Sequence, residues 1–469
     1  MSVATKAPAA SSSDVGADKR NSELGLMVLA WVIGLFAFAQ INWSNDRDFD
    51  TVFWIGIVGA AAAGLFGHAM VRLFAKHAEP IMLPTAYLLN MLGLAMIYRL
   101  DIAADDRATA NGSPTPTPVI FSQLTWLALG MALLMAVLFL IKDHRVLQRF
   151  TYISLLGAGI LLILPLVPGL GATINGATIW IRVGPFSFQP SEIAKILFAI
   201  FVAGYLVVSR ETLSLVRKRW LGIAIPRGRD MGPLLIAWLL GLGILVFERD
   251  LGTAIIFFGM FVVTLYVATG RRSWLIIAGA LIVVGGVFSY FLFSHVRIRF
   301  QIWMDPFAYA TNEGYQIVQA LYGLANGGVF GTGLGQGYPQ LVPFANSDFI
   351  IASFGEELGL TGLFAMLTLY AILVQRGLRV GTACRDTFGR LLAVALASVF
   401  ALQVFVVVGG VTGLIPLTGL TTPFLSAGGS ALVSNWIMIA LLLRISDVTR
   451  RPERYMPSGD TSGIQAVRP

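Results

Sequence analysis

The chain has 469 residues, of which 56% are hydrophobic and only 12% are charged. Soluble globular proteins carry about 25% charged residues, so the composition excludes an ordinary soluble domain. The net charge of +8 does not indicate a nucleic-acid partner, because the basic residues lie in short tracts between apolar runs, as in cytoplasmic loops. These runs are longer than a strand needs and lack two-residue alternation, which predicts an all-α polytopic membrane protein rather than a barrel.

Residues 1–22 contain no apolar run, so we expect a disordered tail there rather than a cleaved signal. About twelve apolar segments follow, each near the roughly 20 residues that a hydrocarbon layer of about 30 Å requires. These predicted spans are 24–42, 53–74, 81–98, 121–141, 150–169, 191–208, 233–247, 251–269, 274–294, 350–375, 388–410 and 431–446. A second tail, 450–469, ends the chain.

The positions of lysine and arginine predict the orientation in the membrane. Alternate connections are basic, from Lys19 and Arg20 near the start to Arg450 and Arg451 near the end. The connections between them are acidic or mixed. By the positive-inside rule, we expect both termini in the cytoplasm and the long loop 295–348 on the outer side.

The outer loop 295–348 is the longest interval without an apolar run. A loop of roughly 50 residues is uncommon in a compact protein unless it has a function. Asp305 precedes a proline, which favours a turn. The glycines of 327–337 lack the G-x-x-x-x-G-K-[ST] signature of a phosphate loop, so flexible turns are expected there.

Asp348 ends this loop directly before a new apolar segment, which places a carboxylate at the edge of the bilayer. One interpretation is a helix cap, since Asn, Ser and Asp precede the segment. The other is a general base, because removing a hydroxyl proton requires an ionised carboxylate near the acceptor. Phe344 and Phe349 beside it would raise its pKa by desolvation.

Charged residues also occur at the ends of apolar segments, where lipid penalises them. Glu192 and Lys195 are three residues apart and share one helix face. They form either an ion pair that packs two helices or, with Asp250, a polar cavity for a charged substrate group. Glu356 and Glu357 leave the same two interpretations open.

Two further features have simple expectations. Trp180 and Arg182 lie in a short outer connection and suit a membrane interface. Cys384 is the only cysteine, so an internal disulfide and a metal cluster held by several cysteines are excluded. We expect Cys384 to fill a small apolar space near a helix end.

Several segments, in this order, resemble the SEDS family (shape, elongation, division and sporulation), the bacterial peptidoglycan polymerases that include RodA and FtsW. The rod-shape branch is the nearer one, and the arginine-rich ending resembles actinobacterial members. The matching segments are NGATIWIR at 175–182, FQPSEIAK at 188–195, ERDLGTA at 248–254, GYQIVQA at 314–320, GTGLGQG at 331–337, NSDFIIASFGEELG at 346–359 and GLIPLTGLTTPFLSAGGSALV at 413–433.

The resemblance implies a bundle of about ten spans, so the first two segments look like an amino-terminal addition. We divide the chain into a tail 1–22, additional helices 23–110, a polymerase core 111–449 with its outer loop 295–348, and a tail 450–469. The implied location is the bacterial cell membrane. The implied activity is a glycosyltransferase that polymerises lipid II into β-1,4 glycan strands and releases undecaprenyl diphosphate, for cell elongation and shape.

The resemblance also implies roles for single residues. The family's essential aspartate matches Asp348 in S-D-F-I, which implies the base that activates the acceptor 4-hydroxyl. Glu192, Lys195 and Asp250 match the family's cavity residues, and Trp180 and Arg182 are further candidate substrate-binding residues. Lys195, with Arg182 or a divalent cation such as Mg²⁺ or Mn²⁺, would stabilise the leaving diphosphate. The sequence does not identify a metal ligand.

The chain departs from the family pattern in three places: Pro343–Asn346 lacks the usual acidic neighbour, Ser426–Ser430 lacks a usual tyrosine, and Glu248–Gly252 replaces Q-P-D-L-G. These changes bear on metal coordination and substrate positioning. The resemblance implies lipid II, the nascent glycan, membrane lipids and a class B penicillin-binding protein as partners.

Two other functions fit the same residues: a transporter that moves lipid II between leaflets, and a scaffold without activity of its own for a transpeptidase. Neither needs a base on the outer side. Asp348→Asn would therefore spare both functions but abolish polymerisation.

Overall fold

The computed structural model describes residues 12–174, 177–183, 186–214, 218–220, 223–225, 243 and 250–451. Within these residues, eleven helical segments are long and apolar enough to cross a membrane. Ten of them are the single helices α1 (Ser12–Ser44), α2 (Thr51–Phe74), α3 (Met82–Ala110), α4 (Val119–Leu140), α6 (Ser191–Ser214), α8 (Leu251–Thr269), α9 (Ser273–Leu292), α12 (Ile350–Ala383), α13 (Thr387–Val411) and α14 (Gly429–Arg450). The eleventh joins α5 (Thr151–Ile163) to the 3₁₀ turns η1 (His144–Phe150) and η2 (Leu164–Leu166).

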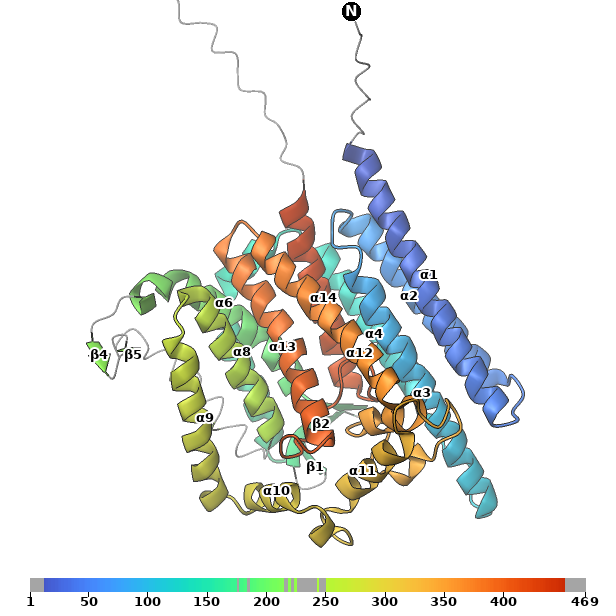
Figure 1. The fold of residues 1–469 in the computed structure, drawn as a ribbon. Helices are drawn as coiled ribbons and strands as arrows, with labels where there is room; N and C mark the ends of the chain where they lie inside the picture. The colour runs from blue at the N-terminus through green and yellow to red at the C-terminus, as the bar shows by residue number, and fades with distance from the viewer. Residues whose placement is uncertain are drawn as a thin grey trace, which may run out of the picture.

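The prediction of an all-helical polytopic membrane protein is confirmed. Eleven of the twelve predicted spans correspond to these segments, and the twelfth, 233–247, lies outside the described residues except for position 243. The predicted disordered tail 1–22 is wrong for residues 12–22, because α1 begins at Ser12, and residues 1–11 lie outside the described residues. The start of α1 and the end of α14 lie at the same end of the bundle (Figure 1).

The burial of the helices separates a centre from a periphery. In the apolar part of α14, 89% of the residues are buried inside the protein, compared with 6% in α9. α14 packs on α4, and α13 packs on α12 and α8, whereas α9 lies at the edge of the bundle (Figure 1). A helix that is apolar all round and exposed at the edge is one that faces lipid.

The loop predicted between 295 and 348 is partly helical. It contains α10 (Ser294–Met304), η3 (Phe307–Tyr309), α11 (Tyr315–Gly327) and η4 (Pro339–Leu341). α10 and α11 lie across one end of the bundle, opposite the end where α1 begins (Figure 1). The predicted turn at Asp305 is confirmed, because its Oδ1 accepts a hydrogen bond of 3.2 Å from Ala308 N at the start of η3.

A small antiparallel sheet at the same end of the bundle was not predicted. It consists of β1 (Gly171–Ile174), β2 (Ala177–Val183) and β3 (Phe186–Phe188), with β2 in the middle. The β-branched residues of β2 favour an extended strand, but the segment is too short to give a clear alternating pattern. A second hairpin pairs β4 (Lys218–Trp220) with β5 (Ile223–Ile225).

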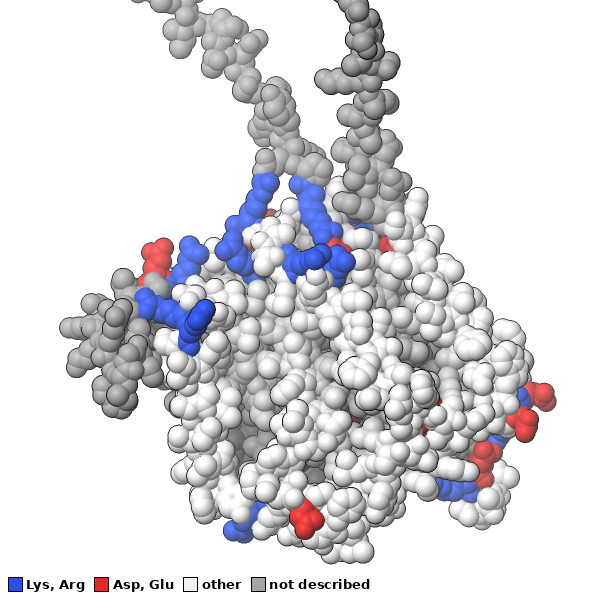
Figure 2. Space-filling view, viewed as in Figure 1, with Lys and Arg blue, Asp and Glu red and all other residues white. Residues whose placement is uncertain are grey.

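The charges at the two ends of the bundle differ in kind (Figure 2). Lysine and arginine gather at the end where α1 begins and α14 ends, whereas the opposite end carries mixed charges such as the Arg47 pairs with Asp105 and Asp106. This distribution is the one that the positive-inside rule uses to assign a cytoplasmic face. The orientation itself remains a prediction.

Candidate functional site

The loop residues before α12 hold Asp348 in place through backbone contacts with the segment 413–428. Ser426 Oγ donates a hydrogen bond of 2.6 Å to Ser347 O, and Ala427 N donates one of 2.7 Å to Asn346 O. A Cβ at Gly419 would lie 3.6 Å from Asp348 Oδ2. Two segments about 70 residues apart therefore meet at this carboxylate.

Asp348 does not cap α12. The residue at the cap position is Phe349, and no side chain accepts a hydrogen bond there. Asp348 is half-buried, whereas Phe349 and Ile350 after it are fully buried. The capping interpretation is therefore wrong, and the carboxylate remains partly accessible.

Arg299 is a candidate site residue that the sequence interpretation missed. It lies on α10, and its Nη1 donates hydrogen bonds of 3.0 and 3.1 Å to the carbonyls of Leu417 and Thr418. This contact brings α10 over the segment 413–428 and places the guanidinium in the electrostatic field of both Asp348 and Asp250. The sequence did contain a signal for Arg299. It is a basic residue in a loop predicted to lie on the outer side, where lysine and arginine are uncommon.

The ionisation of these groups is shifted by their surroundings. Burial raises the pKa of Asp348 to about 6, and the hydrogen bond with Ser347 and the charge of Arg299 only partly oppose this rise. Burial lowers the pKa of Arg299, while the two aspartates favour its charged form. Asp348 is therefore a carboxylate that ionises close to neutral pH, as a general base requires.

Glu192 and Lys195 form the ion pair that the sequence allowed. Lys195 Nζ lies 2.6 Å from Glu192 Oε2 and 3.2 Å from Gln403 Oε1, and both charged side chains are at least 93% buried. Gln403 in turn donates to Thr421 O at 2.9 Å. Lys195 is therefore connected through α13 to the segment that holds Asp348.

Asp250 joins the same region from the start of α8. Its Oδ1 caps the helix by accepting a hydrogen bond of 3.0 Å from Thr253 N, and its Oδ2 accepts one of 3.3 Å from Gln189. Burial raises the pKa of Asp250, whereas the hydrogen bonds from Thr253 lower it. Gln189 N also donates to Ser430 Oγ at 2.9 Å, so the start of α6 is fixed to the start of α14.

Trp180 and Arg182 lie on one face of β2, because side chains two residues apart point the same way in a strand. Trp180 pairs with Ala172 across the sheet, and Arg182 pairs with Ser187. Arg182 is exposed. Within the described residues, no hydrogen bond or ion pair joins these two side chains to Asp348, Glu192 or Asp250.

Glu356 and Glu357 are structural rather than part of the site. Glu357 pairs with Arg99 of α3 at 3.0 Å and accepts a hydrogen bond of 2.9 Å from Gly335 N. Glu356 accepts hydrogen bonds from Asn326 and from Tyr338 N. Both carboxylates are buried and fully engaged with the outer loop.

The glycine-rich segment 327–337 contains the predicted turns, at 328–330 and 334–336, and it packs against these glutamates. α12 is kinked at Gly359, where φ is 64°. The kink leaves the carbonyls of Glu356 and Glu357 free to accept hydrogen bonds of 3.0 Å from Thr332 N and Gly333 N. The glycines are needed because the backbones approach closely: a Cβ at Gly359 would lie 2.3 Å from Gly331 N.

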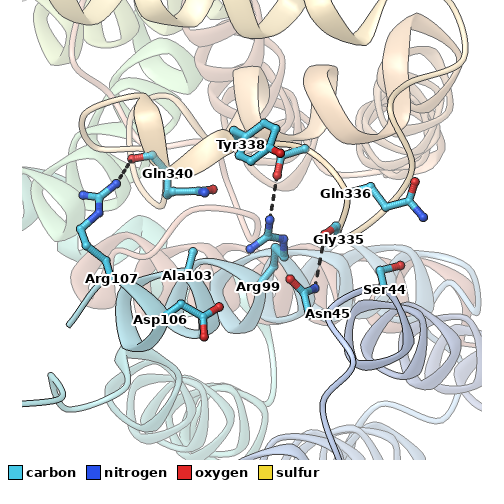
Figure 3. Close-up of a pocket in the computed structure, with 11 residues that line it drawn as sticks. Ser44, Asn45, Arg99, Ala103, Asp106, Arg107, Gly335, Gln336, Tyr338 and Gln340 are labelled. Atoms are coloured by element: carbon cyan, nitrogen blue, oxygen red, sulfur yellow. Dashed lines mark hydrogen bonds between the residues drawn. The ribbon is translucent and has the colours of Figure 1, made fainter. Parts of the chain in front are cut away.

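A cavity of about 610 Å³ lies beside this segment but apart from Asp348 (Figure 3). It is lined by Arg99 and Arg107 of α3, Asn45 after α1, and the loop around Tyr338. None of the predicted site residues lines it. Figure 3 shows its hydrogen bonds joining the amino-terminal helices to the loop, which is a structural role.

A divalent cation at the site was left open by the sequence. Within the described residues, Glu192, Asp250 and Asp348 do not form a group with all their carboxylate oxygens close enough to bind one ion together. Glu192 is paired with Lys195, and Asp250 is engaged with Gln189 and Thr253. The residues present therefore favour a site whose positive charge comes from Arg299, because the charge of Lys195 is matched by Glu192.

The fold and the site define a polytopic helical membrane protein with a polar cluster at one end of the bundle and an accessible carboxylate before a core helix. A family model described as "Cell cycle protein", which groups FtsW, RodA and SpoVE, matches residues 80–451. The chain belongs to this family, the SEDS family. The matched region begins before α3, so only α1 and α2 lie outside it. The predicted division of the chain instead placed α3 among the additional helices 23–110.

Several known proteins are similar over most of the chain. The peptidoglycan glycosyltransferase RodA of Mycobacterium tuberculosis is 47% identical over 443 residues, which cover 94% of this chain and 93% of the relative. Stage V sporulation protein E of Bacillus subtilis is 32% identical over 366 residues, which cover 77% of this chain and 95% of the relative. The resemblance to the rod-shape branch is confirmed.

Two solved structures have the same fold. One, described as the structural coordination of polymerization and crosslinking by a peptidoglycan synthase complex, matches with a TM-score of 0.60 and 27% identity over 76% of this chain and 98% of that one. The rod shape determining protein RodA of Thermus thermophilus matches with a TM-score of 0.56 and 24% identity over 80% of this chain and 98% of that one.

Proposed function

We propose that this chain is a peptidoglycan glycosyltransferase that polymerises lipid II. The observation that carries the proposal is Asp348, a half-buried carboxylate with a pKa of about 6, held by the segment 413–428 beside Arg299. Similarity to peptidoglycan glycosyltransferases over nearly the whole chain supports it.

In the proposed reaction, Asp348 removes the proton from the 4-hydroxyl of the acceptor glucosamine. The hydroxyl oxygen then attacks the muramyl C1 of the donor from the face opposite the diphosphate. The C1–O bond to the diphosphate breaks, and the anomeric centre is inverted to the β configuration. A positioned general base contributes about 10²- to 10⁴-fold to such a step.

The basic residues stabilise the departing diphosphate to different degrees. The charge of Lys195 is matched by Glu192, so Lys195 chiefly orders the helices around the site. Arg299 lies nearer the surface, and two carbonyls and the field of two aspartates hold its guanidinium at the site. Arg299 is therefore the better candidate for contact with the leaving group, and Arg182 on β2 is a second one.

We further propose that the protein lies in the bacterial cell membrane with both termini in the cytoplasm. The basic end of the bundle (Figure 2) then faces the cytoplasm, and Asp348, directly before α12, faces the outer side, where the glycan is assembled. The similarity to the chain in a peptidoglycan synthase complex supports a class B penicillin-binding protein as the partner transpeptidase.

Purified protein in liposomes that contain lipid II tests the proposal against its two rivals. The expected result is long glycan chains together with undecaprenyl diphosphate. Exchange of lipid II between leaflets without polymer would instead indicate a transporter. Neither polymer nor exchange, with binding to the transpeptidase retained, would indicate a scaffold.

A further inference from the structure

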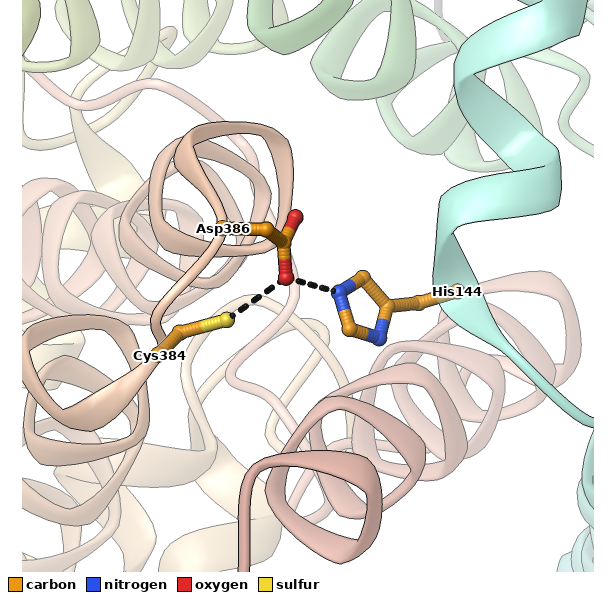
Figure 4. A group of neighbouring side chains, drawn as sticks. All are labelled: His144, Cys384 and Asp386. Carbon is orange, nitrogen blue, oxygen red and sulfur yellow. Dashed lines mark hydrogen bonds and ion pairs between the residues drawn. The ribbon is translucent and has the colours of Figure 1, made fainter. Parts of the chain in front are cut away.

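A second cluster of reactive side chains lies at the basic end of the bundle, away from Asp348. It consists of His144 of η1, Cys384 after α12 and Asp386 before α13 (Figure 4). His144 Nε2 lies 2.8 Å from Asp386 Oδ2, and Cys384 Sγ lies 3.1 Å from the same oxygen. One ligand atom from each residue lies within 4.8 Å of the other two, and His144 and Cys384 are buried.

The absence of a side chain at Gly389 makes this approach possible. A Cβ at Gly389 would lie 2.3 Å from His144 Nε2 and 2.7 Å from Cys384 Sγ. Gly389 N also donates a hydrogen bond of 2.7 Å to Asp386 Oδ1, which fixes the carboxylate at the start of α13. The other carboxylate oxygen therefore faces the histidine and the cysteine.

The second nitrogen of His144 lacks a hydrogen-bond partner. Nδ1 is buried and makes no hydrogen bond with any described residue, although Asp143 Oδ1 lies 3.7 Å from it. If Nε2 carries the ring hydrogen and donates it to Asp386, Nδ1 is left as a buried acceptor without a donor. Leaving such a buried polar atom unsatisfied destabilises the folded protein. If Nε2 binds a cation, Nδ1 carries the hydrogen toward Asp143, the arrangement that metal-bound histidines commonly adopt.

The cluster lies beside a space that can hold a divalent cation, and Arg145, whose Nε lies 3.6 Å from Asp386 Oδ2, would move away when the cation binds. A thiolate and a carboxylate together carry two negative charges, which a divalent cation neutralises. Cys384 and Asp386 also line a cavity of about 310 Å³, together with Arg145, Arg385 and Arg451. This cavity leaves room for a water or a small anion as a fourth ligand, as tetrahedral sites require.

We propose that His144, Cys384 and Asp386 bind one divalent cation of the zinc class, with the imidazole Nε2, the thiolate and one carboxylate oxygen as ligands. The thiol proton is released to solvent when the cation binds. Soft sulfur combined with imidazole and carboxylate favours zinc over magnesium or calcium. The cation fixes η1 to the connection between α12 and α13 at the end of the bundle opposite Asp348.

Cobalt binding tests the proposal with a spectroscopic signal that does not depend on activity. The full-length protein is purified with a tag that lacks histidine and cysteine, and Co²⁺ is added under reducing conditions. We expect one Co²⁺ per chain, a thiolate-to-cobalt charge-transfer band, and loss of the band when Zn²⁺ is added. The band identifies its own source, because Cys384 is the only cysteine in the chain.

Variants separate this site from adventitious binding. Cys384→Ser removes the band, and His144→Asn weakens Co²⁺ binding at least about tenfold. Gly389→Ala also weakens it, since the added methyl group separates His144 from Cys384. The control His77→Asn, which changes a histidine outside the cluster, leaves the band unchanged.

No charge-transfer band at saturating Co²⁺ in the unmodified protein would overturn the proposal, and the cluster would then be a hydrogen-bonded helix cap only. A band that persists with full affinity in His144→Asn would overturn it as well. Both outcomes leave the proposed glycosyltransferase activity untouched, since that activity is measured separately with lipid II.

Discussion

At the scale of single residues, the reactivity of Asp348 depends on the groups that surround it. Burial raises the pKa to about 6, while Arg299 favours the ionised form. A base must be ionised to accept a proton, so the fraction of competent protein is small well below pH 6 and close to complete well above it.

The first prediction follows from this ionisation. Polymerisation by the purified protein, measured as a function of pH, rises about tenfold per pH unit below about 6 and then levels off. Arg299→Gln removes a positive charge that stabilises the carboxylate, so the midpoint moves to higher pH. A midpoint that stays in place, or moves to lower pH, in Arg299→Gln would exclude this electrostatic role.

The sequence predicted some of these residues and not others. The charge of Glu192, Lys195 and Asp250 at the ends of apolar segments was a sufficient signal, because lipid penalises unpaired charge. The position of Arg299 was not predictable, since it depends on α10 folding back over residues 413–428. The sequence alone also left open that Asp348 caps α12, and only the backbone geometry of the structure excludes this alternative.

At the scale of elements, α12 is shaped by its kink at Gly359. The positive φ and the contact with Gly331 both exclude a side chain at this position. The kink lets the outer loop donate backbone hydrogen bonds to the carbonyls around Glu356. A core helix and the loop that precedes it are thereby joined directly.

The second prediction concerns this kink. Gly359→Ala forces a Cβ into the backbone of Gly331 and strains a backbone conformation, φ 64° and ψ −168°, that is essentially restricted to glycine, which alone costs about 1–3 kcal/mol. We expect a lower denaturation temperature in detergent. The control is Gly285→Ala in α9, where nothing lies within 4 Å of the added Cβ. Equal denaturation temperatures for the two variants would contradict the packing that we describe.

The spans were predictable as elements because each is a long apolar run of the length that a bilayer requires. The kink was not, because nothing in the sequence distinguishes Gly359 from the other glycines of the predicted spans. The sheet β1–β2–β3 was also missed, because strands of three to seven residues give little periodicity to detect.

At the scale of the whole molecule, the amino-terminal helices are fixed to the core by buried polar contacts. Arg99 of α3 pairs with Glu357 of α12 and donates to Gly337 O at 2.8 Å. At the other end of the bundle, Arg444 of α14 donates to Phe74 O at the end of α2 and pairs with Asp447. Both ends of the bundle are therefore joined across segments distant in sequence.

The third prediction tests the first of these contacts. Arg99→Gln leaves Glu357 buried without its charged partner, and removing one member of a buried pair costs about 3–5 kcal/mol. The denaturation temperature should fall well below that of the unmodified protein. Arg47→Gln serves as the control, since exposed pairs such as those with Asp105 and Asp106 are worth about 0–1 kcal/mol. Similar losses in both variants would contradict the structural role of Arg99.

The class of the molecule and the order of its spans followed from hydropathy, and both stand in the described residues. The contacts between distant segments did not, because a single sequence carries no information about which helices are neighbours. The early start of α1 at Ser12 was likewise missed, since its first turns are polar and resemble a disordered tail.

The central claim is that the carboxylate of Asp348 is the base of the polymerisation reaction. The most direct measurement compares glycan synthesis from lipid II by purified Asp348→Asn and Asp305→Asn, which make the same chemical change in the same loop. We predict a loss of about 10²-fold or more for Asp348→Asn and little change for Asp305→Asn, which caps only a turn. Substantial polymerisation by correctly folded Asp348→Asn would contradict the claim.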